Sequence, residues 1–148
     1  MINNSKVLAL KYRPQTFDQL IGQQVASQTI FNAIKSNNSA NAYIFTGIRG
    51  VGKTTFARIL AKSLNCENGI ENLCKENFCQ NCEAIINSNH IDILEIDAAS
   101  NTGVDSVREL LDFSRYQPSI AKFKIFIVDE VHMLSKQAFN ALLKTLEE

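Results

Sequence analysis

The stretch AYIFTGIRGVGKTT, residues 42–55, decides the fold. Residues 42–46 are mostly apolar, with β-branched and aromatic side chains, and this composition predicts a short strand. A loop with three glycines, residues 47–52, comes next. Apolar residues then recur at helical spacing, at Phe56, Ile59, Leu60 and Leu64. The predicted order is therefore strand, loop and helix.

The loop matches the pattern G-x-x-x-x-G-K-[ST], which is typical of phosphate-binding loops. Its glycines let the backbone turn tightly, so that successive N–H groups point at phosphate oxygens beside the positive end of the next helix. We predict that Lys53 reaches the β- and γ-phosphates, that Thr54 offers its hydroxyl to Mg²⁺ and that Thr55 contacts the α-phosphate. The alternative is a chance glycine-rich turn, which the flanking strand and helix disfavour. The candidate nucleotide-binding residues are Gly47, Ile48, Arg49, Gly50, Val51, Gly52, Lys53, Thr54 and Thr55.

Further strands and helices alternate along the rest of the chain. Ile91, Ile93 and Ile96 predict a second strand, and residues 125–128 are a continuous apolar run typical of a covered parallel strand. Helical spacing predicts three further helices. One lies before the first strand, one ends before Pro118 and one follows residue 135. Their apolar residues are Ala26, Ile30, Ala33 and Ile34 in the first, Val104, Val107 and Leu111 in the second, and Phe139, Leu142, Leu143 and Leu146 in the third. The alternation predicts an α/β fold, with a parallel sheet flanked by helices.

The acidic pair Asp129-Glu130 directly follows the apolar run at 125–128. Ligands of parallel sheets bind at the carboxyl edge of the strands, where these side chains are expected. We predict that Asp129 holds Mg²⁺ through water and that Glu130 polarises the attacking water as a general base. Together with Lys53 they form the candidate catalytic set. Acidic residues also cap helices at such positions, which is the alternative.

His132 lies just after the acidic pair, among apolar residues. A histidine there can sense a γ-phosphate, but a packed or capping role is the commoner one, and we leave it outside the catalytic set. Ser100, Thr102 and Asp105 precede a predicted helix, and we interpret them as its N-terminal cap, with a nucleic-acid backbone contact as the alternative.

All four cysteines of the chain, Cys66, Cys74, Cys79 and Cys82, lie in one short insertion after the loop helix. Segment 66–83 has too few apolar residues to order itself by burial. Four thiolates around Zn²⁺ would supply that order, because metal binding to such a site is coupled to folding. We therefore predict a zinc-binding module over residues 66–82. Reduced thiols and disulfides are the alternatives, and disulfides are disfavoured in a cytoplasmic chain.

The charges are unevenly distributed along the chain. Residues 1–65 carry eight Lys or Arg and one acid, while residues 66–148 carry seven basic and fourteen acidic residues, so the two parts have net charges of +7 and −7. The basic part is expected to meet anions. Solvated helix faces are the alternative, and we interpret Arg49, Arg108 and Lys136 in that way. No apolar run approaches the length of a membrane span, and no secretory signal is recognisable, so we expect a cytoplasmic protein.

The combination of motifs resembles a known family. Several segments are similar to the γ/τ clamp-loader subunits of bacterial DNA polymerase III. They are KYRPQTF at residues 11–17 with IGQ at 21–23, the glycine-rich loop, the four-cysteine insertion, EIDAAS at 95–100 and VDEVHMLS at 128–135. These subunits are AAA+ ATPases, and the resemblance spans nearly all 148 residues.

The resemblance implies a partial AAA+ nucleotide-binding domain over residues 1–148, cut before the helical lid of a longer protein. It implies that residues 47–54 bind ATP with Mg²⁺, that Asp129 and Glu130 serve hydrolysis, and that the four cysteines hold structural Zn²⁺. The family's segment near the adenine is matched by Tyr12, Arg13, Pro14, Ile21 and Gly22.

The implied function is that of an ATPase subunit of the clamp loader, which loads a sliding clamp onto primed DNA. The implied partners are the other clamp-loader subunits, in a hetero-oligomer when the protein is full length, the sliding clamp and primed DNA, without any membrane. The chain alone is expected to bind Mg-ATP weakly and to turn it over poorly. The alternatives are a non-catalytic, nucleotide-dependent scaffold subunit and another AAA+ DNA motor.

Overall fold

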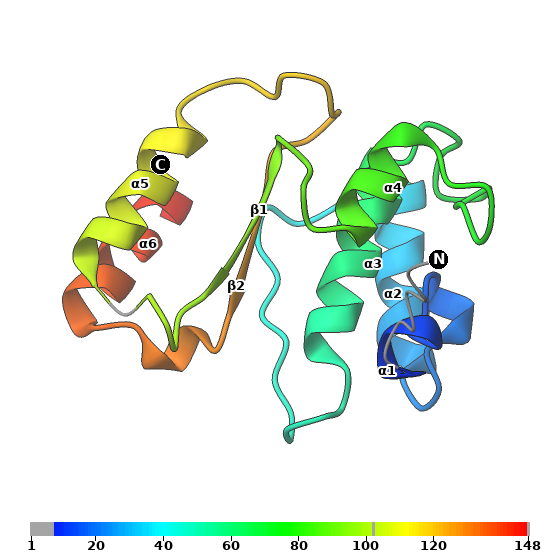
Figure 1. Cartoon of the computed structure of the whole chain (residues 1–148), viewed down its shortest axis with the longest axis horizontal. Helices are drawn as coiled ribbons and strands as arrows, with labels where there is room; N and C mark the ends of the chain where they lie inside the picture. The colour runs from blue at the N-terminus through cyan, green and yellow to red at the C-terminus, as the bar shows by residue number, and fades with distance from the viewer. Residues whose placement is uncertain (1–7, 102, 148) are drawn as a thin grey trace, which may run out of the picture.

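The computed structural model describes residues 8–101 and 103–147, which form an α/β structure (Figure 1). In chain order the elements are α1 (Leu8–Lys11), the 3-10 helix η1 (Phe17–Gln19), α2 (Gln24–Lys35), α3 (Lys53–Asn65), α4 (Gln80–Ile86), β1 (Ile93–Asp97), α5 (Val104–Ser114), β2 (Ile125–Asp129), the 3-10 helix η2 (Val131–Met133) and α6 (Lys136–Glu147). The described helices include none that is long and apolar enough to cross a lipid bilayer.

The sheet consists of β1 and β2, which pair in parallel. Isoleucine-rich sequences build both strands, as expected for residues that pack well on a pleated surface. The two strands run in step, with Ile93 opposite Ile125 and Asp97 opposite Asp129. The predicted strands around 91–96 and at 125–128 are confirmed, and the register brings two carboxylates to the same edge of the sheet.

The strand predicted at residues 42–46 is wrong. These residues are drawn as a loop rather than a strand (Figure 1, cyan), and the sheet of the described chain contains only β1 and β2. Their side chains do alternate: Phe45 packs on Phe56 of α3 with ring centroids 5.0 Å apart, while Ile44 is 84% exposed. A strand also needs backbone hydrogen bonds from a neighbour, and none of the described strands pairs with these residues.

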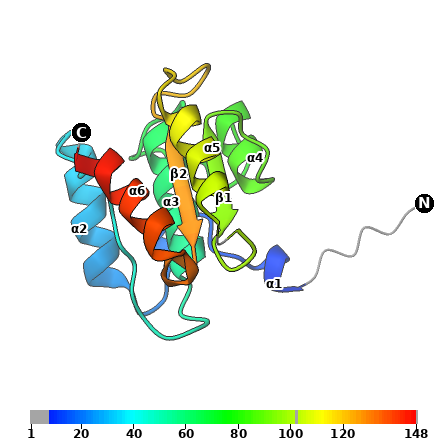
Figure 2. The ribbon, with the colours of Figure 1, turned by 90° about the vertical axis from the view of Figure 1, so that its left-hand side faces the viewer.

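Helices cover both faces of the sheet, with α5 and α6 in front of it and α3 behind it in Figure 2. Ile127 points to the α3 and α4 side, where it clusters with Ala61 and Ile85. Its neighbour Val128 points to the opposite side and packs against a cluster that includes Val107 of α5. Successive residues of a strand face opposite ways, so one short strand is anchored in two cores. A parallel sheet flanked by helices is therefore confirmed.

The largest buried cluster joins α2, α3 and the cysteine segment. It contains Phe17, Leu20, Ile30, Phe56, Ile59, Leu60, Cys66, Leu73, Cys74 and Cys82. The predicted helices are confirmed as α2, α3, α5 and α6, whereas α4 was not predicted. The apolar stripe of α6 is less buried than its spacing suggested, because Phe139, Leu143 and Leu146 are 38%, 41% and 51% exposed.

Candidate functional site

The glycine-rich loop, residues 47–52, is largely exposed and leads directly into α3. Gly50 and Gly52 have φ angles of +83° and +94°, which glycine adopts without the steric cost of a Cβ. A Cβ on Gly47 would lie 3.2 Å from the Val51 side chain, closer than ordinary packing. The loop therefore favours glycine at all three positions, of which Gly47 and Gly52 are the fixed glycines of the motif.

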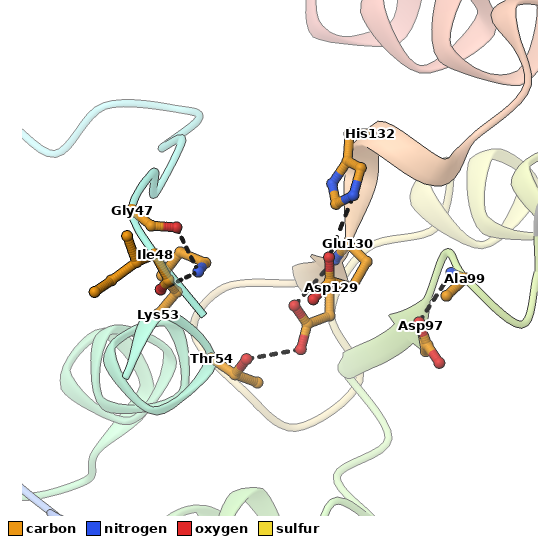
Figure 3. A network of polar contacts seen from close by, with 9 residues as sticks. All are labelled: Gly47, Ile48, Lys53, Thr54, Asp97, Ala99, Asp129, Glu130 and His132. Atoms are coloured by element: carbon orange, nitrogen blue, oxygen red, sulfur yellow. Dashed lines mark hydrogen bonds and ion pairs between the residues drawn. The ribbon is translucent and has the colours of Figure 1, made fainter. Parts of the chain in front are cut away.

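Lys53 folds back over the loop that precedes it (Figure 3). Its ammonium donates hydrogen bonds to the carbonyl oxygens of Gly47, at 2.9 Å, and Ile48, at 3.0 Å. The Phe56 N–H donates to the Gly52 carbonyl at 2.9 Å, so the N–H groups of the three preceding residues lie at the open end of α3. A cation and a helix N-terminus thus face the same space, which is an arrangement suited to phosphate.

Thr54 connects the loop to the carboxyl edge of the sheet. Its hydroxyl donates a 2.7 Å hydrogen bond to Asp129 Oδ2, although the two residues are 75 positions apart in the chain (Figure 3). The other carboxylate oxygen of Asp129 accepts the Glu130 N–H at 3.0 Å. A hydroxyl and a carboxylate side by side are the hard oxygen ligands that Mg²⁺ prefers.

Glu130 has a left-handed backbone, with φ of +51°. This conformation is uncommon for a residue other than glycine, and it turns the chain sharply from β2 into η2. The Glu130 side chain is 47% exposed, and one of its carboxylate oxygens lies 3.5 Å from His132 Nε2. A packed role for His132 is wrong, because its side chain is 70% exposed and faces the Glu130 carboxylate.

Asp97 is a residue of this edge that the sequence analysis did not single out. It lies opposite Asp129 in the register, and it ends β1 as Asp129 ends β2. Its carboxylate accepts the Ala99 N–H at 2.9 Å and the Ser100 hydroxyl at 2.8 Å, so it is engaged in its own turn. The signal for it was the matching position of two acids at the ends of adjacent parallel strands.

The predicted side-chain cap of α5 is wrong. The N-cap is Gly103, with no capping side chain among the described residues, and Ser100 instead bonds to Asp97. Asp105 lies in the first turn and pairs with Arg108 at 3.4 Å, while Thr102 lies outside the described residues.

The exposure predicted for three basic side chains, those of Arg49, Arg108 and Lys136, is confirmed.

The candidate adenine residues lie on either side of η1. Tyr12 is 73% exposed and Ile21 is 95% exposed, and Gly22 has φ of +80° in the turn before α2. Within the described chain, none of Tyr12, Arg13, Pro14, Ile21 and Gly22 forms a hydrogen bond to residues 47–52. Phe17, which follows this segment closely, packs against Phe56 in the first turns of α3, with ring centroids 5.5 Å apart.

An ion pair that the sequence analysis missed ties α3 to the sheet. Arg58 donates to the two carboxylate oxygens of Glu95 at 2.8 and 2.5 Å, and both side chains are mostly buried. Burial and then the positive charge of Arg58 lower the pKa of Arg13, while the negative charge of Glu95 raises it. The signal was an acid in the middle of a strand, between two apolar neighbours, since such a charge needs a partner.

The four cysteines converge although they are spread over the segment. Their Sγ atoms all lie within 4.8 Å of one another, and those of Cys66 and Cys74 are 3.6 Å apart. Tetrahedral zinc with bonds of about 2.3 Å separates its sulfur ligands by about 3.8 Å. The cysteines therefore fit a zinc site with only small adjustments.

The surroundings of the thiols differ. Burial raises the pKa of Cys66 and that of Cys82, which is fully buried. Burial also acts to raise the pKa of Cys74, but hydrogen bonds from the Cys79 N–H and the neighbouring thiols outweigh it and lower that pKa to about 7. Asn68 donates a further bond to Cys74 Sγ at 3.3 Å. Polar donors already surround a sulfur that would carry negative charge on binding a metal.

Comparisons with known proteins show the family to which the chain belongs. Residues 22–148 match the model of the family described as DNA polymerase III, delta subunit. The chain belongs to this family of DNA polymerase III subunits. It is 52% identical to DNA polymerase III subunit tau/gamma of Haemophilus influenzae and 50% identical to DNA polymerase III subunit tau of Escherichia coli K12, each over 97% of the chain.

A third relative, DNA polymerase III subunit gamma of Buchnera aphidicola from Baizongia pistaciae, is 53% identical over 98% of the chain. The chain spans about a fifth to two fifths of the length of these curated relatives: 21% of the Haemophilus protein, 22% of the Escherichia protein and 39% of the Buchnera protein. The resemblance to the γ/τ subunits is confirmed.

Proposed function

We propose that this chain is the ATP-binding and ATP-hydrolysing part of a DNA polymerase III clamp-loader subunit of the AAA+ class, acting in the cytoplasm. The observation that carries the proposal is the 2.7 Å hydrogen bond between Thr54 and Asp129, which joins the glycine-rich loop to the acidic end of β2. The identity of about half of the residues with tau and gamma subunits supports it. In this proposal the partners are the other clamp-loader subunits, a sliding clamp and primed DNA.

The loop and the start of α3 would bind the triphosphate. Lys53 would exchange its bonds to the Gly47 and Ile48 carbonyls for bonds to the β- and γ-phosphates. The N–H groups around residues 50–55 would bind the phosphate oxygens, with Thr55 at the α-phosphate. Tyr12, Arg13, Pro14, Ile21 and Gly22 would lie nearest the adenine.

Thr54 and Asp129 would hold Mg²⁺, which neutralises phosphate charge when it is bound. Glu130 would orient the attacking water and accept its proton as a general base. Its carboxylate is half exposed and lies beside His132, so water can reach it. The Glu130 N–H donates to Asp129 Oδ1 at 3.0 Å, which holds the Asp129 carboxylate against the backbone of Glu130.

The four cysteines would hold a structural Zn²⁺ in an inserted module over residues 66–82. Zinc supplies cross-links between short segments there, and the cysteines contribute ligands from the end of α3, from the loop and from the start of α4. Elemental analysis tests this part. About one zinc per chain is expected, and a Cys82→Ser variant should lose it; a wild-type protein without zinc after purification in zinc-containing buffer would remove the metal site.

Steady-state ATP turnover by the complete protein, assembled with the other clamp-loader subunits, tests the main proposal. Turnover should rise strongly when the sliding clamp and primed DNA are added together. Turnover indifferent to the clamp would instead indicate another AAA+ DNA motor. ATP binding without turnover under any of these conditions would indicate a non-catalytic scaffold subunit.

A further inference from the structure

Lys62 is a buried cation near the end of α3, and the nucleotide proposal does not use it. The residue is 2% exposed, and its ammonium donates three hydrogen bonds. The acceptors are the Gln15 carbonyl at 2.9 Å, Gln15 Oε1 at 3.2 Å and the Cys74 carbonyl at 3.3 Å. An ammonium has three N–H donors, so its hydrogen-bonding capacity is fully used.

The ammonium also lies against the cysteine segment. It is 4.8 Å from the centroid of the Phe78 ring. Burial lowers the pKa of Lys62, and the charges of the four cysteines act in the opposite direction and raise it. Four thiolates with one divalent ion leave two negative charges in excess, and buried charge is costly unless it is paired. Lys62 provides a positive charge on the buried side of the cluster.

Lys75 is a natural contrast to Lys62. It is adjacent to Cys74 in the sequence, but its side chain is 58% exposed and its ammonium pairs with Asp18 at 2.8 Å. A basic residue next to a cysteine in the sequence is therefore not enough to reach the cluster. The buried position of Lys62 follows from helical spacing, four residues before Cys66 on the same face of the chain.

The contacts of Lys62 continue into the N-terminal segment. The Gln15 side-chain amide donates to the Arg13 carbonyl at 3.2 Å, and the Gln15 N–H donates to Gln19 Oε1 at 2.7 Å. A continuous series of bonds thus runs from the Cys74 carbonyl through Lys62 and Gln15 to Arg13. Residues 13–19 are held on α3 at a point next to the cysteine cluster.

We propose that Lys62 is a positioning residue that couples the cysteine cluster to residues 13–19. Its ammonium balances the charge of the metal-loaded cluster and, through Gln15, orders the N-terminal segment. The inference rests on the proposed metal site. It goes beyond that site because metal binding would also order residues 13–19. Removing a group that contacts a metal-binding residue rather than the metal itself typically changes metal affinity by about 10- to 100-fold.

The first test is zinc affinity, measured by competition with a chromophoric chelator for the wild type and for Lys62→Met and Lys75→Met. Lys62→Met keeps the length of the side chain and removes the charge, and it should weaken zinc binding by about 10- to 100-fold. Lys75→Met removes the same charge from an exposed site, and it should stay within about twofold of the wild type. Equal affinities for Lys62→Met and the wild type would overturn the inference while leaving the metal site in place.

The second test is hydrogen–deuterium exchange of residues 13–19, with α5 as an internal reference. Removing zinc from the wild type should speed exchange in residues 13–19 about tenfold or more and leave that of α5 unchanged. Gln15→Ala removes the side-chain acceptor of Lys62 but keeps the Gln15 carbonyl, so it should speed exchange in the same segment and weaken zinc binding less than Lys62→Met does.

The exchange measurement also tests the coupling between the cysteine cluster and residues 13–19 if Lys62→Met does not fold. Exchange of residues 13–19 that does not respond to zinc removal in the wild type, or to Gln15→Ala, would overturn the coupling. A wild-type protein that binds no zinc would instead remove the proposed metal site, and that failure is distinguishable because it is detected before any variant is compared.

Discussion

The Thr54 hydroxyl donates a 2.7 Å hydrogen bond to Asp129 Oδ2, across 75 residues of sequence. This bond joins the first turn of α3 to the last residue of β2. The side chains proposed to face Mg²⁺ are therefore already in contact. Pre-organisation of this kind reduces the cost of assembling a site when its ligand arrives.

Removing the Thr54 hydroxyl should weaken Mg²⁺-dependent nucleotide binding. We expect Thr54→Ala to lower affinity for Mg-ATP at least tenfold, with little effect on binding measured in excess EDTA. Titration with a fluorescent ATP analogue measures both. Thr54→Ser retains the hydroxyl and should bind within a few-fold of the wild type; if it is as weak as Thr54→Ala, the hydroxyl has no role in binding.

Replacing Glu130 should separate binding from hydrolysis. Glu130→Gln keeps the shape of the side chain but cannot accept a proton, so turnover by the complete clamp-loader assembly should fall by about 10²-fold or more while ATP affinity is retained. Rapid-quench and equilibrium-binding measurements check the two parts. His132→Ala is the matched control at the same edge, and it should retain most of the turnover; unchanged turnover in Glu130→Gln would exclude Glu130 as the base.

The ion pair between Arg58 and Glu95 should stabilise the packing of α3 on the sheet. Both side chains are less than a quarter exposed, and the contact uses two parallel hydrogen bonds. A double-mutant cycle with Arg58→Met and Glu95→Gln, followed by urea denaturation, should give a coupling free energy of about 1–2 kcal/mol. The exposed pair between Lys35 and Glu71 is the control, and its coupling should be close to zero.

A buried carboxylate should make stability depend on pH. Asp92 is 1% exposed and accepts the N–H groups of Ser119, Ile120 and Ala121 at 2.7–2.8 Å. Burial acts to raise its pKa, but these three bonds outweigh it and hold the pKa of Asp92 below its usual value of about 3.9. The stabilisation is therefore present above about pH 4 and is lost as pH falls through the lower pKa of the folded state.

Asp92→Asn should destabilise the protein by about 2–4 kcal/mol at pH 7, because an amide cannot accept all three bonds. The difference from the wild type should shrink towards acidic pH. Urea denaturation at a series of pH values measures it. A difference that stays constant down to pH 2 would show that the carboxylate charge is not responsible.

His90 should produce a second decrease in the free energy of unfolding, at a higher pH than the decrease caused by Asp92. It is 6% exposed, and its Nδ1 accepts the Asp92 N–H at 3.0 Å, which leaves Nε2 to donate to Asn81 Oδ1 at 3.1 Å. Burial lowers its pKa, opposed by the charge of Asp92, so the unfolded chain takes up a proton first as pH falls below about 6.5. Stability should decrease from that pH downwards, and His90→Gln should remove this part of the profile.

Local patterns predicted most of the fold and most of the candidate nucleotide site. The helices α2, α3, α5 and α6 and the parallel strands follow from the spacing of apolar residues, which depends only on neighbours in the chain. The glycine-rich motif also predicted where the backbone needs positive φ, as found at Gly50 and Gly52.

Features that depend on distant partners could not be predicted in this way. Residues 42–46 have the composition of a strand, but pairing is a property of two segments, and spacing within one segment does not determine it. The contacts of Lys62 and Arg58 are with Gln15 and Glu95, which are distant in the chain, so helical spacing alone does not predict them. The helix α4 was not predicted, because its seven residues are too few to show a distinct helical spacing of apolar side chains.

The two-stranded sheet has a consequence for handling the protein. Within the described residues, β1 and β2 each have one neighbour, so the outer side of each strand offers backbone groups for pairing. The extended residues 42–46, with Ile44 outward, add an apolar segment that is free of the sheet. Concentrated samples are therefore expected to self-associate by edge-to-edge strand addition, and a lysine in place of Ile44 should keep them monodisperse.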